Sequence, residues 1–154
     1  ISMIETKTTS EVKATGKVHI VKTNSQGVVT YDYTVPNLVV TTGKNFIASK
    51  LRAITNSPTS MTHMAIGTSS TAPAAGDTAL IAQTGRVTLS GDTATNNYVT
   101  FTATFPAGTG DGAIQEAGIF NASTGGTMLC RTTFPTVTKQ SGDTLAVTWV
   151  VTVS

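Results

Sequence analysis

The residues best suited to hold a metal ion are few and widely separated in this chain. Its two histidines, His19 and His63, fall in different predicted strands, and Cys130 is the single cysteine, so no intrachain disulfide can form. A zinc or iron site needs three or four ligands at suitable spacing, and the chain contains no His-x-His or His-x-x-x-His pair. The sequence therefore predicts no metal site, and each histidine is expected to be a half-buried strand residue.

Acid–base chemistry would have to come from carboxylates, and hydrolysis of a glycoside needs two of them across a cleft. The acidic residues are Glu5, Glu11, Asp32, Asp77, Asp92, Asp111, Glu116 and Asp143. Several of the aspartates follow glycine in predicted turns, where aspartate is favoured because it binds nearby backbone N–H groups; these are Asp77, Asp92, Asp111 and Asp143. Glu116 instead lies inside the apolar segment 113–120. It could be a perturbed acid, an ion-pair partner of Arg86 or Arg131, or an outward-facing side chain, and we favour a structural role over catalysis.

Patterns typical of a nucleophile or of a phosphate-binding loop are missing. A Ser-His-Asp triad is defined in space and not in sequence, but the chain has no Gly-x-Ser-x-Gly segment. The loop Gly108–Gly112 lacks the Gly-Lys-Ser/Thr of a phosphate loop and has too few acids for an EF-hand. We therefore predict a protein that is not an enzyme, with no catalytic, cofactor-binding or metal-binding residues.

The composition favours a folded chain that packs through weakly charged surfaces. Charged residues make up 12% of the 154 positions, about half the usual share of roughly 25%. Threonine occupies 32 positions, and a threonine-rich surface can pack against another protein with little desolvation of charge, although threonine also covers solvated strand faces. The net charge of +2 and the pI of 8.8 are too mild to indicate a nucleic-acid partner. No apolar run approaches the length of a membrane span.

The elements that must position these residues are mostly strands. Alternation of apolar and polar residues predicts strands at 14–23, 28–35, 61–67, 79–89, 98–105, 113–120, 128–134 and 144–153. We expect Pro36 to end the second strand and residues 91–97 to form a turn. Helical spacing of Phe46, Ile47, Leu51 and Ile54 predicts one helix at 42–54, with Thr42 as its N-cap.

These elements predict a mainly β fold: an antiparallel β-sandwich, jelly-roll-like, with one short α-helix. A chain of this length fits one domain, which we place at residues 14–154, with Trp149, Phe101 and Phe105 in one core. Residues 1–13 have few side chains to bury and are expected to form an N-terminal arm. The arm either frays in solution or adds an edge strand to a neighbouring subunit.

Two groups of segments resemble small virion proteins of tailed bacteriophages, described as capsid decoration (cement) or tail-fibre-related proteins. The first group is Asn37–Ala48, His63–Thr68 and Asp77–Leu80, and the second is Ile114–Asn121, Gly125–Arg131 and Gly142–Leu145 before Trp149. The resemblance spans most of residues 14–153 and is one of layout, with no active-site signature. It implies a structural protein of the virion, assembled in the bacterial host cytoplasm, and does not decide between head and tail.

The favoured hypothesis is a capsid decoration protein that binds the outer shell and stabilises it through many weak, symmetry-repeated contacts. The expected partners are phage capsid or tail proteins and further copies of this chain, as a dimer or trimer, with no nucleic acid and no membrane. A tail, neck or fibre component is one alternative. A carbohydrate-binding module is another, for which Tyr31, Tyr33 and Tyr98 would be the exposed aromatics.

Overall fold

A computed structural model describes residues 11–52 and 57–154 of the chain, which form strands and one helix. The elements are β1 (Ala14–Thr23), β2 (Val29–Val39), α1 (Thr41–Lys50), β3 (His63–Gly67), β4 (Gln83–Thr88), β5 (Gly91–Thr95), β6 (Tyr98–Phe105), β7 (Gly112–Phe120), β8 (Met128–Lys139) and β9 (Thr144–Val153). The mainly β class with one short helix is confirmed. Of the expected arm, residues 1–10 lie outside the described residues.

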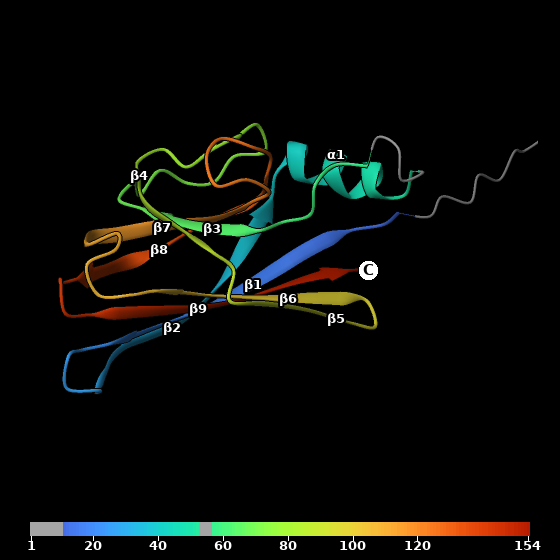
Figure 1. Ribbon diagram of the computed structural model, residues 1–154. Coiled ribbons are helices and arrows are strands. Elements are labelled where there is room, and N and C mark those ends of the chain that lie inside the picture. The colour runs from blue at the N-terminus through green and yellow to red at the C-terminus, as the bar shows by residue number, and fades with distance from the viewer. Residues whose placement is uncertain (1–10, 53–56) are drawn as a thin grey trace, which may run out of the picture.

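The strands form one curled antiparallel sheet in the order β4-β3-β7-β8-β2-β1-β9-β6-β5. The sheet folds over into the two facing layers seen in Figure 1, with β4, β3, β7 and β8 in the upper layer and β1, β9, β6 and β5 in the lower one. β2 joins the layers, because most of its length pairs with β1 while its end, at Leu38 and Val39, pairs with β8. The predicted sandwich is therefore built from a single sheet that shares one strand.

The core fills the space between the two layers. Trp149 pairs with Phe101 across β9 and β6, and both belong with Phe105 to one cluster of buried side chains, as predicted. The upper layer contributes Ile66 and Ile119 to the same cluster. Burying side chains of this size contributes about 1.5–3 kcal/mol each, so these inward-facing strand positions hold the fold together.

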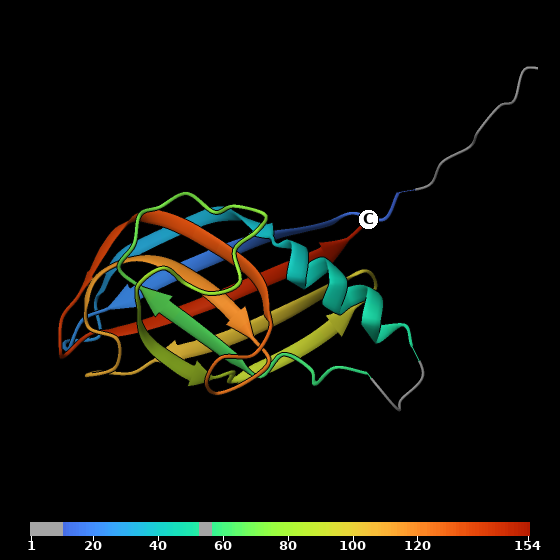
Figure 2. The same ribbon diagram turned by 90° about the horizontal axis from the view of Figure 1, so that it is seen from above.

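The outer face of the upper layer is also covered. The connection 68–82 between β3 and β4 lies over this layer beside α1, as Figure 2 shows from above. A second, smaller apolar cluster forms beneath these coverings from Val40, Ala65, Leu80, Phe120 and Met128. A long connection can stay in place here because it buries apolar side chains of its own.

The second strand is longer than the sequence predicts. Pro36 does not end it, because β2 continues to Val39 and Pro36 stands opposite Lys17 of β1. Hydrogen bonding alternates along an antiparallel strand, and the backbone groups of Lys17 are directed towards β9. The N–H that proline lacks is therefore not needed by the ladder between β1 and β2.

The segment 91–97 is also not wholly a turn. Residues Gly91–Thr95 form β5, which pairs with β6, and the chain reverses at Asn96 and Asn97. Asn96 has φ of +52°, a left-handed conformation that asparagine tolerates better than most residues. The asparagine pair therefore makes a shorter reversal than expected and leaves room for an edge strand.

The helix begins earlier than expected and is not capped by Thr42. It runs from Thr41 with Val40 at the N-cap, where no side chain accepts a hydrogen bond from the helix. The Thr42 hydroxyl instead donates to the Met128 carbonyl at 3.0 Å. The helix packs on β8 so closely that any side chain at Gly43 would collide with the Leu129 carbonyl.

The expected apolar side of the helix is only partly used. Phe46 and Ile47 pack against the core, but Leu51 is 88% exposed just beyond the end of the helix. Ile54, at the predicted end of the helix, lies outside the described residues. The exposed Leu51 leaves an apolar surface at this end of the molecule.

Candidate functional site

Two fully buried charges, Glu116 on β7 and Arg131 on β8, pair with each other. Gly118 of β7 stands directly opposite Arg131 of β8, and Glu116 is two residues before Gly118 on the same face of β7. The side chains of Glu116 and Arg131 therefore both lie on the outer face of the upper layer. The guanidinium donates to Oε2 of Glu116 from Nε at 3.0 Å and from Nη2 at 2.9 Å, and both side chains are 0% exposed. Of the two arginines considered from the sequence, Arg131 is thus the one that pairs with Glu116.

The remaining polar atoms of this pair hold the connection 68–82. The Glu116 carboxylate accepts hydrogen bonds from the backbone N–H of Ile81 at 3.1 Å and of Ala82 at 2.7 Å. Arg131 donates to Asp77 Oδ2 at 3.1 Å and to the Thr71 carbonyl at 2.9 Å. Both carboxylate oxygens of Glu116 are therefore occupied, and the ion pair acts as a clamp on the covering connection.

Two further ion pairs hold other loops in the same way. Lys139 is fully buried, and its Nζ donates to Asp111 at 2.8 Å and to the Pro106 carbonyl at 3.0 Å, which anchors the glycine-rich loop after β6. Lys22 lies 3.6 Å from Asp143 in the turn between β8 and β9. We call these two pairs and the Arg131–Glu116–Asp77 cluster the loop locks.

Part of the loop locks was foreseeable from the sequence. Asp77 and Asp143 each accept a hydrogen bond from a backbone N–H three residues earlier, at 2.9 Å, which confirms the turn role expected of them. Their pairing with Arg131 and Lys22 was missed, because the partners are distant in the sequence. Asp92 does not lie in a turn but in the edge strand β5.

Arg86 holds one more loop. Its guanidinium carbon lies 3.8 Å from the centroid of the Phe120 ring, and its Nη1 donates to the carbonyls of Ala122 and Gly125. Partial burial lowers the pKa of Arg86 from its ordinary value. The loop between β7 and β8 is thereby fixed against β4.

The histidines and the cysteine lie apart. His19 is on the lower layer, with its Nε2 2.6 Å from Asp32 Oδ1, whereas His63 on the upper layer contacts the hydroxyl of Thr62. Cys130 is buried in the main core, and burial raises the pKa of its thiol. Across residues 11–52 and 57–154, no three His, Cys, Asp or Glu side chains are grouped in a way that could hold a metal.

The outer face of the lower layer carries a different chemistry. Because Trp149 and Phe101 point inward, the side chains that alternate with them along β9 and β6 point outward. The strand register then places threonines side by side on this surface, which we call the threonine face: Thr15 on β1, Thr148 and Thr152 on β9, Thr100, Thr102 and Thr104 on β6, and Thr93 and Thr95 on β5. The outward positions of β5, β6 and β9 carry no Asp, Glu, Lys or Arg.

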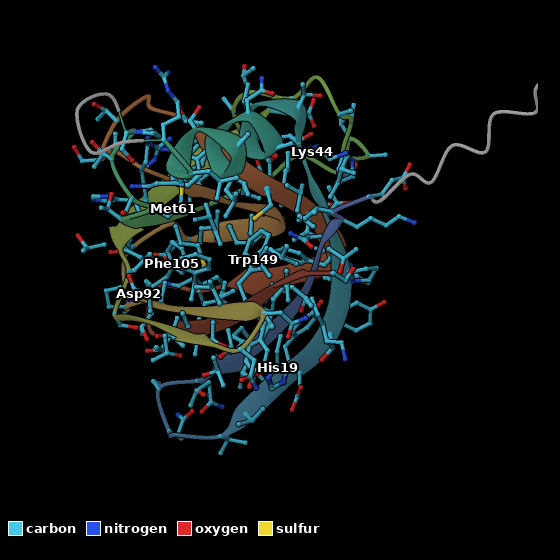
Figure 3. The ribbon with its side chains drawn as sticks, turned by 90° about the vertical axis from the view of Figure 1, so that its right-hand side faces the viewer. His19, Lys44, Met61, Asp92, Phe105 and Trp149 are labelled. Carbon is cyan, nitrogen blue, oxygen red and sulfur yellow. The ribbon has the colours of Figure 1, made fainter. Side chains whose placement is uncertain are left out.

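The threonine face is uncovered within the described chain. In Figure 1, α1 and the 68–82 connection both lie above the upper layer, whereas the hairpin between β1 and β2 projects below the lower layer at the left. In the view of Figure 3, Asp92 lies at the edge of this layer and His19 on the neighbouring β1. The part of this surface on β5, β6 and β9 is therefore free of Asp, Glu, Lys and Arg side chains. On the neighbouring β1, Lys17 and His19 face the same side, opposite Val150 and Thr148 of β9.

The tyrosines do not form one aromatic platform. Tyr31 and Tyr33 are neighbours on β2, with ring centroids 6.2 Å apart and planes inclined by 48°. The Tyr31 hydroxyl donates to the Pro135 carbonyl at 2.9 Å. Tyr98 lies on β6, on the threonine face.

No protein-family model, curated protein or solved structure matches this chain. No helix in the described part of the chain is both long enough and apolar enough to cross a membrane.

Proposed function

We propose that this protein is a non-enzymatic structural protein of a bacteriophage virion, and specifically a capsid decoration (cement) protein. In this role it binds the outside of the shell and stabilises it. The observation that carries the proposal is the threonine face, whose outward positions on β5, β6 and β9 are rich in threonine and carry no Asp, Glu, Lys or Arg. Docking such a surface desolvates hydroxyl groups that can form new hydrogen bonds across the interface, at a much smaller cost than desolvating charges.

The loop locks support the same role. They place charged side chains where they hold loops to the sheet, as Glu116 and Arg131 do at 0% exposure. A protein that must keep its shape while repeated around a shell benefits from connections held by several specific contacts. The resemblance of the segments around Asn37–Ala48 and Ile114–Asn121 to small phage virion proteins points to the same class.

The first test is to locate the protein on virions. Negative-stain imaging with a specific antibody is expected to label the head surface of the parent phage. Labelling confined to the neck, tail or fibres would replace the decoration role by the tail alternative. Absence of label on intact virions that contain the protein by mass spectrometry would refute an external role.

The second test addresses the surface. Thr93→Lys and Thr104→Lys each place a cation at an exposed position of the threonine face, and both are expected to weaken co-sedimentation with shells that lack the protein. Thr136→Lys is the matched control, because Thr136 is exposed on β8 in the other layer. Equal binding by all three variants would show that the threonine face is not the docking surface.

A further inference from the structure

The N-terminal end of β1 has an open edge. The ladder between β1 and β2 begins only at the pair Gly16–Asn37, whereas the ladder between β1 and β9 already begins at Ala14. Within the described chain, Ala14 and Thr15 therefore pair on one side only. The edge is open because the end of β2 turns away from β1 to join β8 at Leu38 and Val39.

The backbone along this edge is oriented for strand addition. Lys13 and Ser154 exchange both backbone hydrogen bonds, at 2.7 and 2.8 Å, so the N–H and C=O of Lys13 point towards the C-terminal end of β9. Since these groups alternate in direction along a strand, the N–H and C=O of Val12 and Ala14 point to the open side. An extended segment placed there would find hydrogen-bonding groups already aimed at it.

A groove of about 730 Å³ runs along this edge. Its lining comes from the start of β1, the end of β9 and the region of α1, and includes Val12, Ala14, Ile47, Leu51 and Val153. Figure 3 looks onto this end of the molecule, with Lys44 on the helix. Val12 and Leu51, at 78% and 88%, are the most exposed large apolar side chains among the described residues. Large apolar side chains left exposed beside an open strand edge indicate a surface that another chain covers.

We propose that the occupant is the same segment of a second copy, paired antiparallel about a two-fold axis at Val12. The charge pattern is self-complementary in this register: Glu11 stands opposite Lys13 of the second copy, and Lys13 opposite its Glu11. Val12 meets its own equivalent as a hydrogen-bonded pair, which agrees with the direction of its backbone groups. Glu11 and Lys13 lie on the same face of the strand, where their side chains approach to 4.0 Å within one copy.

The length of the shared ladder follows from the same register. Within the described residues it pairs Glu11, Val12 and Lys13 of the two copies, and it ends before Gly16, where the edge is already occupied by Asn37. Directly opposite residues of antiparallel strands point to the same side, so the two threonine faces, which include Thr15, lie on one side of the dimer. The inference rests on the proposed structural role and deepens it, since a dimer would present two docking surfaces together.

Sedimentation velocity of the full chain tests the dimer and its charge pairing. The unchanged protein is expected to sediment as a concentration-dependent dimer. Glu11→Lys or Lys13→Glu turns both cross-strand pairs into like-charge pairs and should raise the dimer Kd about tenfold or more. The double variant Glu11→Lys/Lys13→Glu restores opposite charges and should recover most of the affinity. A monomer at all concentrations, or a dimer indifferent to these changes, overturns the proposal.

Disulfide trapping tests the register. Mixing the Glu11→Cys and Lys13→Cys variants under oxidised glutathione is expected to give a covalent heterodimer, because directly opposite residues lie within disulfide range. Each variant alone is the matched control, since equivalent cysteines would then be diagonal and beyond about 7 Å. The buried Cys130 does not compete. Equal trapping in the mixture and in the separate variants would show a different contact.

The outcomes separate this inference from the proposed function. A protein that labels virions but is monomeric, or dimerises elsewhere, would overturn the β1 pairing alone. A trapped dimer that does not bind virions or shells would overturn the virion role and leave the pairing intact.

Discussion

Replacing Arg131 by methionine tests whether the buried ion pair holds the fold together. The change removes the guanidinium and leaves the Glu116 carboxylate at 0% exposure without its cation, and Asp77 and the Thr71 carbonyl each lose a donor. Removing one partner of a buried ion pair typically costs about 3–5 kcal/mol. The N–H groups of Ile81 and Ala82 still bind the carboxylate, so we expect the lower half of that range.

The assay is urea unfolding followed by the fluorescence of Trp149, the single tryptophan, which is 0% exposed in the core. For a protein of this size each kcal/mol shifts Tm by roughly 2–4 °C, so we expect thermal unfolding to begin some 6–16 °C lower. Elastase should also cleave the freed connection near Ala74 and Ala75 faster. Arg52→Met is the matched control, because it makes the same chemical change at an exposed position and should stay within about 0.5 kcal/mol.

A double variant separates the pair from its parts. Arg131→Met/Glu116→Leu removes both charges, and replacing a buried ion pair by apolar groups is often close to neutral. Here the N–H groups of Ile81 and Ala82 lose their acceptor, so recovery should be partial. We expect the double variant to cost at least about 1 kcal/mol less than the sum of the single variants. A cost under about 1 kcal/mol for Arg131→Met, or strict additivity, would refute the clamp.

Three other changes test the core and its boundary. Trp149→Ala should lower the free energy of unfolding, followed by circular dichroism, by about 3–5 kcal/mol, because it empties a large buried site. A loss under about 1 kcal/mol would mean that the core closes over the gap. Cys130 should react with a thiol reagent only after unfolding, because burial disfavours its thiolate; rapid reaction in the native protein would contradict this. Burial, and secondarily the neighbouring Tyr33, raises the pKa of the Tyr31 hydroxyl above its ordinary value of 10. The protonated Tyr31 therefore stabilises the folded protein below pH 10, and this stabilisation is lost as the pH rises further, because the unfolded chain ionises first. Tyr31→Phe should therefore lower the free energy of unfolding by about 0.5–1.5 kcal/mol at pH 7, because the hydrogen bond to the Pro135 carbonyl is lost. Above pH 10 the variant should lose less stability with rising pH than the unchanged protein does. Parallel pH profiles of the two proteins would contradict this assignment.

The sequence alone determined most of the strands and the main core. Strict alternation at 98–105 and 144–153 predicted β6 and β9 with their observed bounds and placed Trp149 and Phe101 in one core. Alternation is informative here because one face of each strand is buried and the other is solvated, so the side-chain pattern repeats every second residue. Local chemistry also predicted the turn roles of Asp77 and Asp143, which depend only on nearby backbone.

Only the tertiary structure decided how distant residues meet. Pro36 is tolerated in β2 because its partner Lys17 directs its backbone hydrogen bonds towards β9 and not towards β2. No local sequence pattern specifies this direction. Glu116 could be assigned to Arg131 rather than Arg86 only once β7 and β8 were placed next to each other. The open edge at Ala14 likewise exists because β2 leaves β1 for β8. Each of these depends on register between strands far apart in the chain, which a pattern of single residues does not specify.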